Sequence, residues 1–249
     1  MDKRVLDKKI ELEGTFVETL RNGRREILEY NSAKDVLVRF ENGYERRCAM
    51  QKLLSGYVKN PYRDKVFGVG ILDVPSNGVN KPIYKAWCNM LKRCYYRGGD
   101  YHTYADCTVD ESWFKFSNFL SDLKDFRNFD KIYEGWHLDK DLLYPNNKIY
   151  SKLTCCIVPT DVNCLVLDSA ICGSSLPTGV SYLKDSGKYR AYLSCYNKQK
   201  YLGRYSDVES ARVAYVSAKI EYVEEVLGKY ADTIDQRVLV SLNERYGKG

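Results

Sequence analysis

Three short strand-like segments followed by one long helical segment are the feature that most limits how this chain can fold. LPTGVSYLK, GKYRAYLSCYN and KQKYLGRYS each alternate apolar and polar residues, and turn-forming residues separate them at Asp185-Ser186-Gly187 and Tyr196-Asn197. The segment 207–230 then carries an apolar stripe at helical spacing, made of Ala211, Ala214, Tyr215, Ala218, Tyr222 and Leu227. Because a small sheet needs a partner for its apolar face, we expect this helix to cover one face of the sheet. Asp207 is the expected N-cap.

The opposite face of this sheet is predicted to be polar, basic and aromatic. Side chains alternate along a strand, so Ala191 and Leu193 face the helix while Arg190, Tyr192 and Ser194 face outward. Between residues 176 and 204 the chain has six Lys or Arg residues and one acid, whereas the whole chain has 39 against 33 and a net charge of +6. Such a face suits base edges and phosphates in a DNA groove. An ordinary solvated sheet face is the alternative.

The order G-V-S, S-G-K-Y-R-A and Y-L-G, followed by the Ala-rich ESARVAYVSAK, resembles the AP2 DNA-binding domain. The resemblance implies a sheet of three antiparallel strands on one helix, with duplex DNA bound by the exposed face. Carried over by position, it implies DNA contacts or nearby phosphate contacts from Ser181, Lys184, Lys188, Arg190, Tyr192, Ser194, Lys198, Gln199, Lys200, Tyr201 and Arg204. The resemblance places Leu183 at one of the DNA-facing positions as well. Ser, Leu and Gln stand where plant members of the family have Arg or Trp.

A second informative stretch, WHLDKDLLYPNNKIYSKLTCCIVPTDVN, spans residues 136–163 and holds one of the chain's two histidines. Strand alternation puts His137, Asp139 and Asp141 on one face and Lys140 on the other. Asp and Asn oxygens are ligands for hard cations, and a histidine near neutral pH is a suitable base for activating water. These parts suffice for metal-assisted phosphodiester hydrolysis. Alternatively, the carboxylates bind local backbone donors and His137 has no role.

This stretch resembles the HNH endonuclease motif of phage and intron-borne homing endonucleases, and RCYYRGGDYHTYADCTVDESWFKFSNFL resembles the region before the motif in phage members with AP2 tails. The resemblance places the ligand or base on the first strand at His137, Asp139, Lys140 or Asp141. It places a loop-bracing asparagine at Asn147, or else Asn146, and a metal-binding residue at Asn163. The implied catalytic set is therefore His137, Asp139, Asn147 and Asn163, with Mg²⁺ or Mn²⁺ bound by Asp139 and Asn163.

The rest of the chain predicts an α+β protein of several domains. Residues 1–72 read as a small antiparallel β module with hairpin turns at Asn22-Gly23 and Asn42-Gly43 and alternation at Val36, Val38 and Phe40. Residues 80–172 form the HNH-like, ββα-containing module, with helices predicted at 82–96 and 111–126 and a helix start near Pro159. Residues 176–249 form the AP2-like sheet and helix, followed by a short helical tail.

Composition limits the remaining possibilities. No apolar run is long enough for a membrane span and the first residues lack a secretory signal, so we expect a cytoplasmic protein, in the host bacterium if phage-encoded. Nine scattered cysteines without a CxxC pair read as reduced core residues rather than a structural zinc site, although Cys94, Cys107, Cys155 and Cys156 are possible ligands.

Three functions remain open from the sequence. The first is a metal-dependent endonuclease acting on double-stranded DNA, with no small-molecule substrate and no membrane partner. The second is a catalytically inactive DNA-binding protein on the same scaffold, with a regulatory or anti-host role. The third is a protein-interaction module. Salt-sensitive DNA binding separates the third from the others, and metal-dependent nicking separates the first from the second.

Overall fold

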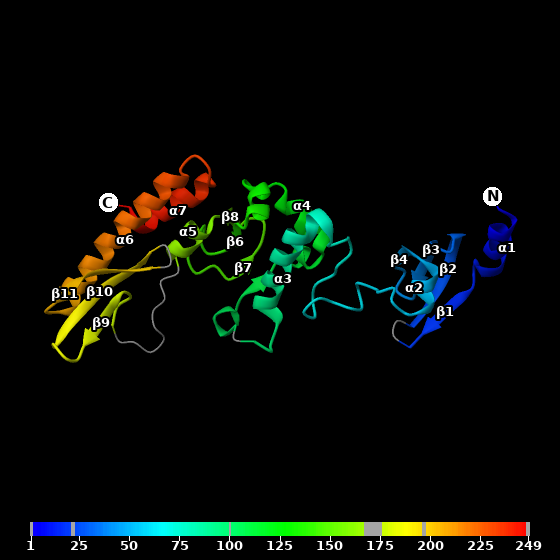
Figure 1. Ribbon diagram of the computed structural model, residues 1–249, viewed down its shortest axis with the longest axis horizontal. Coiled ribbons are helices and arrows are strands. Elements are labelled where there is room, and N and C mark those ends of the chain that lie inside the picture. Colours follow the sequence, from blue (N-terminus) through cyan, green and yellow to red (C-terminus); the bar gives the residue numbers. More distant parts are fainter. Residues whose placement is uncertain (1, 21–22, 100, 167–175, 196–197, 248–249) are drawn as a thin grey trace. The chain divides into compact units, whose positions relative to one another are not determined.

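The computed structural model describes residues 2–20, 23–99, 101–166, 176–195 and 198–247. The chain is a mixed α+β protein with several small sheets and helices (Figure 1). It divides into two compact units, Met1–Asp73 and Val74–Gly249. The turns predicted at Asn22 and at Tyr196-Asn197 and the module boundary predicted near residue 172 fall outside the described residues.

The first unit is built on an antiparallel sheet whose strands lie in sequence order. These are β1 (Phe16–Thr19), β2 (Gly23–Ser32), β3 (Asp35–Phe40) and β4 (Glu45–Cys48). Val36, Val38 and Phe40 are buried, so the predicted alternation is confirmed. The turn at Asn42-Gly43 is confirmed as well, because Gly43 has a φ of 81° and its N–H donates to the Phe40 carbonyl at 2.9 Å.

Two helices complete this unit, α1 (Lys3–Leu12) and α2 (Met50–Leu54). The core beneath the sheet contains Ile27, Tyr30, Leu53 and Val58 in addition to the buried residues of β3. Asp2 caps α1 by accepting a hydrogen bond from the Arg4 N–H at 3.0 Å.

The second unit begins with α3 (Lys81–Tyr95), which follows a short 3₁₀ turn, η1 (Gly78–Asn80). Pro82 lies in the first turn, where its missing N–H costs nothing. The predicted inner face is confirmed, since the structure buries Ile83, Trp87, Met90, Leu91 and Cys94.

The prediction of one continuous helix over 111–126 is wrong. The segment divides into a 3₁₀ helix, η3 (Glu111–Phe114), and an α-helix, α4 (Phe116–Leu123), with Lys115 in an extended conformation between them. Asp110 caps η3 through the Ser112 N–H at 2.9 Å, and Asn118 Nδ2 donates to the Ser112 carbonyl at 2.9 Å. These local bonds satisfy backbone groups outside an α-helical pattern and so compete with it.

Short elements fill the middle of the second unit. A parallel pair joins β5 (Thr108–Val109) to β7 (Ile149–Tyr150), and an antiparallel pair joins β6 (His137–Asp139) to β8 (Cys156–Val158). Helix α5 (Thr160–Asn163) begins directly after Pro159, as predicted. The 3₁₀ helices are η2 (His102–Tyr104), η4 (Phe129–Glu134) and η5 (Cys164–Val166).

The C-terminal sheet has the strand order β11-β10-β9 and is antiparallel throughout, with β9 (Val180–Leu183), β10 (Lys188–Cys195) and β11 (Lys198–Tyr205). Helix α6 (Val208–Tyr230) lies along one face of this sheet and contacts all three strands (Figure 1). The predicted cap is confirmed, because Asp207 accepts a hydrogen bond from the Ser210 N–H at 2.8 Å. That bond lowers the pKa of Asp207.

Gly179 sets how closely β9 approaches α6. It has a φ of 75°, and a Cβ at this position would lie 2.1 Å from the Tyr215 ring and 2.7 Å from the Tyr192 carbonyl oxygen. Only glycine combines this conformation with this approach. Leu183 and Lys188 flank the turn predicted at Asp185-Ser186-Gly187, where Gly187 also has a positive φ.

The tail folds as α7 (Gln236–Tyr246), which packs beside α6 (Figure 1). One hydrophobic core joins these two helices to the middle of the unit, because Val226, Val238 and Leu242 pack with Val158 and Val162. The stripe predicted for α6 is only partly buried, and Val223 and Val226 contribute where we did not expect them. None of the helices in the described part of the chain has the length and apolar character needed to cross a bilayer.

Candidate functional site

A small ββα unit brings together residues that are far apart in the sequence. In the β6–β8 pair His137 lies opposite Val158, and Asp139 lies opposite Cys156. His137 and Asp139 therefore project from one face of β6, with Leu138 on the other. Helix α5 follows β8 and contacts β6, so the helix that carries Asn163 lies against the strand that carries Asp139.

Asp139 ends β6 and organises the loop that follows. Its Oδ1 accepts hydrogen bonds from the N–H groups of Asp141 and Leu142, both at 2.7 Å. Burial raises the pKa of Asp139, and the nearby charge of Asp141 adds to the rise, whereas the two backbone hydrogen bonds and Lys140 oppose it. No described residue bonds Oδ2, so one oxygen of this carboxylate is left for a ligand.

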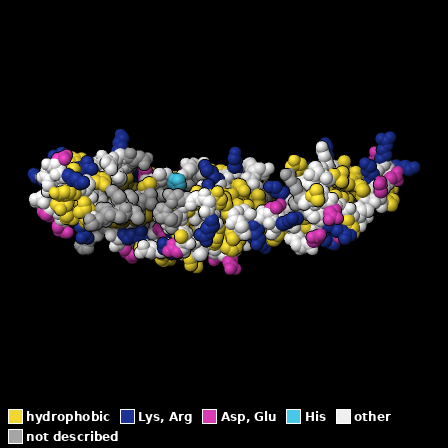
Figure 2. Space-filling model, turned by 90° about the horizontal axis from the view of Figure 1, so that it is seen from below, with side chains coloured by type: hydrophobic (Ala, Val, Ile, Leu, Met, Phe, Trp, Pro, Cys, Tyr) yellow, Lys and Arg dark blue, Asp and Glu magenta, His cyan; other side chains and the backbone are white. Residues whose placement is uncertain are grey.

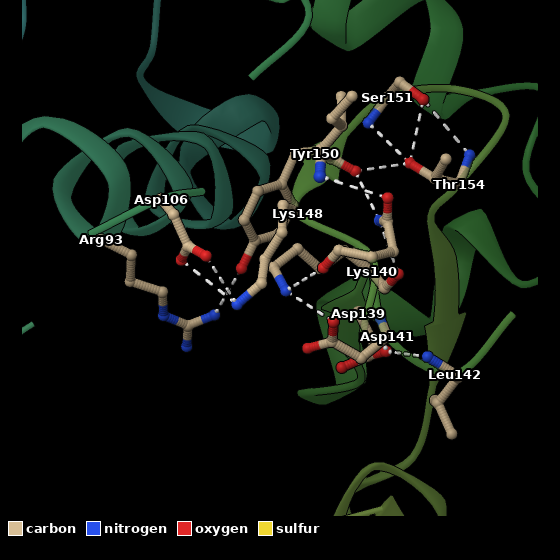
Figure 3. Close-up of polar contacts among 12 residues, drawn as sticks. Arg93, Asp106, Asp139, Lys140, Asp141, Leu142, Lys148, Tyr150, Ser151 and Thr154 are labelled. Carbon is tan, nitrogen blue, oxygen red and sulfur yellow. Dashed lines mark hydrogen bonds and ion pairs between the residues drawn. The ribbon is translucent and has the colours of Figure 1, made fainter. Parts of the chain in front are cut away.

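Lys140 points into the loop, away from the face of His137 and Asp139. Its side chain is 5% exposed, and Nζ donates to Asp141 Oδ1 at 2.6 Å and to the Asn147 carbonyl at 2.8 Å (Figure 3). Burial alone would lower the pKa of Lys140, but the ion pair with Asp141 leaves it raised. Two of the four positions considered from the sequence, Lys140 and Asp141, therefore form an ion pair with each other.

The structure distinguishes between the two adjacent asparagines. Asn147 Nδ2 donates to the carbonyls of Lys140 at 2.9 Å and Ile149 at 2.7 Å, and its Oδ1 accepts from the Ile149 N–H at 3.2 Å. These three bonds close the loop from β6 to β7. Asn146 is exposed and has a φ of 61°, a conformation that asparagine tolerates. The bracing position is therefore Asn147.

His137 and Asn163 belong to the same ββα unit as Asp139. The exposed His137 ring contacts Thr160 Oγ1 through Nε2 at 3.0 Å, which ties it to the first residue of α5. Asn163 is half-buried three residues later, and no described residue bonds its carboxamide. Thr160 was not expected from the sequence, because a threonine after a proline is common at helix starts.

Helices α6 and α7 support this unit from outside. Ser241 Oγ donates to the Leu142 carbonyl at 2.6 Å, and Arg245 Nη2 donates to the carbonyls of Asp141 at 2.5 Å and Leu142 at 2.9 Å. Lys229 and Tyr230 both bond Asp161 Oδ2, at 3.0 and 3.1 Å. The loop after β6 and the start of α5 are thus held by residues about a hundred and about seventy positions away.

Two side-chain oxygens of this unit are of the kind that a hard divalent cation takes as ligands. Mg²⁺ usually takes one or two protein oxygens and completes its shell with water and phosphate oxygens. The Oδ2 of Asp139 and the carboxamide oxygen of Asn163, which make no hydrogen bond with a described residue, could serve as such ligands, and they lie on elements in contact. No group of three or more His, Cys, Asp or Glu side chains that could hold a metal occurs in the described part of the chain.

The cysteines considered as zinc ligands are buried. Cys94, Cys107, Cys155 and Cys156 all lie in the interior of the second unit. Burial raises the pKa of Cys94 and that of Cys155 to about 12, so both thiols keep their protons at neutral pH. The thiolate is the form that binds metal.

A cleft of about 450 Å³ adjoins β6, whose residues His137 and Leu138 contribute to its lining. Helix α3 forms one wall through Lys81, Lys85, Asn89 and Arg93, and the segment 132–138 forms the other. We call this the basic cleft. Its α3 residues were missed from the sequence, although their spacing of four along a predicted helix put them on one face, away from the buried one.

The outer face of the C-terminal sheet has the predicted character. Strand register and alternation put eight of the expected contact residues on the face turned away from α6: Ser181, Lys188, Arg190, Tyr192, Ser194, Gln199, Tyr201 and Arg204. Arg190 Nε donates to Ser181 Oγ at 3.2 Å, and its guanidinium lies 5.5 Å from the Tyr192 ring centroid. Tyr201 is 59% exposed.

The other three expected residues lie elsewhere. Lys184 lies in the exposed turn after β9. Lys198 and Lys200 pair with Cys195 and Leu193, so they share a face with the buried Leu193, although both lysines are exposed. Figure 2 shows one side of the whole molecule, on which Lys and Arg side chains are scattered among acidic and apolar ones, without one large basic area among the described residues on that side.

Comparison with known proteins identifies no relative of this chain. The chain matches no protein-family model, and no curated protein or solved structure shows significant similarity to it.

Proposed function

We propose that this protein is a DNA endonuclease of the HNH type that hydrolyses phosphodiester bonds with Mg²⁺ or Mn²⁺. The observation that carries the proposal is the ββα unit, in which Asp139 and His137 share one face of β6 and α5, the helix that carries Asn163, contacts that strand. The Asn147 bonds that brace the loop and the exposed sheet of β9–β11 support it. The resemblance to homing endonucleases of phage supplies the reaction.

In this proposal each residue has a chemical role. The Asp139 carboxylate and the Asn163 carboxamide hold the metal ion. That ion, when bound, stabilises the negative charge that develops on the scissile phosphate and the leaving oxygen. His137 accepts a proton from the attacking water, and Thr160 orients the imidazole through the contact at Nε2. Asn147 keeps Asp139 in place through the loop.

The C-terminal sheet supplies duplex binding. Its polar and aromatic outer face is similar in kind to the DNA-contacting face of AP2 domains, with Arg190, Tyr192 and Tyr201 near its middle. Aromatic and guanidinium groups contact bases and phosphates, and the surrounding lysines add salt-dependent affinity.

A plasmid-nicking assay tests the enzymatic proposal. We expect purified protein to convert supercoiled DNA to the nicked or linear form with Mg²⁺ or Mn²⁺ and to do nothing in EDTA. Asp139→Ala and Asn163→Ala each lower the rate by about 100-fold or more, since even residues that only support metal ligands cost 10- to 100-fold. Asp106→Ala removes an exposed carboxylate that lies in the second compact unit but outside the ββα unit, and it should leave the rate unchanged.

A second candidate function rests on Lys140. Lys140 follows Asp139 in the sequence and turns inward to the Asn147 carbonyl, so His137 is the one histidine of β6. The same scaffold would also suit a protein that binds DNA without cutting it. Salt-sensitive DNA binding without nicking under any divalent metal would favour this regulatory or anti-host role over the nuclease.

A further inference from the structure

The basic cleft combines cations on one wall with apolar and aromatic side chains on the other. Lys81 and Lys85 are exposed and make no ion pair with a described residue, and the hydrogen bond of Arg93 goes to the Tyr150 hydroxyl at 3.4 Å. Among the described residues, no Asp or Glu side chain lines the cleft. Lys81 and Lys85 are four residues apart on α3, where two like charges destabilise a helix slightly. A bound anion would remove that repulsion.

A small anion alone would not match the second wall of the cleft. Ile132, Trp136 and Leu138 are apolar, and Tyr133 is an aromatic residue that is 41% exposed. Free phosphate would leave these surfaces in contact with water. A nucleotide has both parts, because its phosphate suits the lysines and its base stacks on aromatic side chains.

The position of the cleft relates it to the proposed catalytic residues. His137 and Leu138 line it, and Asp139 is the next residue along β6. A DNA strand lying in the cleft would therefore reach the end of β6 where the metal ligands are proposed.

We infer that the basic cleft binds one strand of DNA, with its phosphates on Lys81, Lys85 and Arg93 and a base against Tyr133 and Trp136. This inference extends the proposed nuclease function. It rests on that function because a strand bound in the cleft would lead to the metal ligands proposed at the end of β6. It assigns to α3 a role in positioning the substrate that is separate from duplex binding by the C-terminal sheet.

Trp136 provides a local readout for this site. The chain has three tryptophans, and Trp87 and Trp113 are both fully buried, whereas Trp136 is partly exposed in the cleft wall. We expect a single-stranded oligothymidylate to quench its fluorescence in EDTA, where no cleavage occurs. The double variant Lys81→Ala/Lys85→Ala should weaken this binding about tenfold and lower the salt-dependence slope by about 1.4, at roughly 0.7 for each phosphate that a lysine no longer neutralises.

The control is Lys115→Ala/Lys124→Ala, which removes the same charge from exposed lysines outside the cleft and should bind like the unaltered protein. Lys85→Glu is a second variant with a larger expected loss. Circular dichroism establishes that each variant is folded. Wild-type-like quenching by both cleft variants would overturn the inference, as would equal binding of inorganic polyphosphate and oligothymidylate without quenching.

The two proposals fail separately. Quenching that depends on Lys81 and Lys85 in a protein that never nicks DNA leaves strand binding in place and removes the nuclease. Normal nicking, together with cleft variants that bind and cut like wild type, removes the cleft and leaves the nuclease.

Discussion

The loop after β6 and the sheet of β9–β11 use polar residues in opposite ways. In the loop, the side chains of Asp139, Lys140 and Asn147 bond backbone groups of the loop, and Lys140 also pairs with Asp141. On the outer face of the sheet, Tyr201 and Lys188 are exposed to solvent.

The difference suggests that the polar groups of the loop shape a site, whereas those of the sheet contact a long ligand. Inward polar groups hold a loop in one conformation because each unmet bond would be costly, and metal chemistry needs that precision. Outward groups remain free to adjust to a polyanion whose binding depends on charge and salt. The comparison predicts that changes in the loop act mainly on stability, whereas changes on the sheet act mainly on binding.

The largest expected effect is on the loop. Asn147→Ala removes three hydrogen bonds and should lower the free energy of unfolding of the second unit by about 2–3 kcal/mol, at roughly 1 kcal/mol each. Urea denaturation followed by tryptophan fluorescence measures this unit alone, because all three tryptophans lie between residues 87 and 136.

Asn146→Gly is the matched control, since glycine keeps the positive φ and the side chain makes no bond with a described residue. We expect a change within about 0.5 kcal/mol. Equal losses for the two asparagines would mean that Asn147 does not brace the loop.

Substitutions on the sheet should change DNA binding rather than stability. Arg190→Ala removes a cation from the outer face and should lower the salt-dependence slope of duplex binding by about one unit, with little change in stability. Lys200→Ala removes one charge from the other face and should have a smaller effect. Fluorescence anisotropy with a labelled duplex between about 50 and 200 mM salt measures both, and a larger effect of Lys200 would mean that the sheet binds by its other face.

The smallest expected effect is the pH dependence from Asp139. Its pKa is raised in the folded state by burial, so its contribution to stability is fully present below the unfolded value, about 3.9, and is lost as the pH rises through the raised folded value. The stability of the wild type relative to Asp139→Asn should therefore fall between acidic and neutral pH. Urea denaturation in EDTA at a series of pH values measures this difference.

Asp106→Asn provides a control of opposite sign. The hydrogen bond from Lys148 lowers the pKa of Asp106, so its contribution is present above the unfolded value and is lost as the pH falls through the lower folded value. Because this pair is exposed, salt should weaken its effect. The same trend in both variants would contradict the assigned burial of Asp139.

Periodicity and capping predicted the elements whose stabilising contacts are local. The buried face of α3, the Asp207 cap and the alternation of β10 follow from spacing in the chain, and the structure contains each of them. The helix predicted over 111–126 failed because Asp110 and Asn118 bond backbone groups in a way that periodicity does not reveal.

The candidate site required more than spacing. The resemblance placed the ligand or base at His137, Asp139, Lys140 or Asp141, and strand alternation set only Lys140 apart from the other three. Burial of Lys140 against the Asn147 carbonyl separated it from the face of Asp139. The choice between Asn146 and Asn147 likewise depended on which side chain reaches the carbonyls of Lys140 and Ile149.

The sequence by itself determined the types of secondary structure, the residues of the principal helix faces and the polar character of the C-terminal sheet, because these depend on residues a few positions apart. Only the tertiary structure decided that Arg245 holds the loop after β6, that α5 lies against that strand, and that the lysines of α3 face residues 132–138. These contacts join segments tens of residues apart or more. They form when the core buries its apolar side chains, and no local pattern encodes which backbone carbonyls or charged side chains then become neighbours.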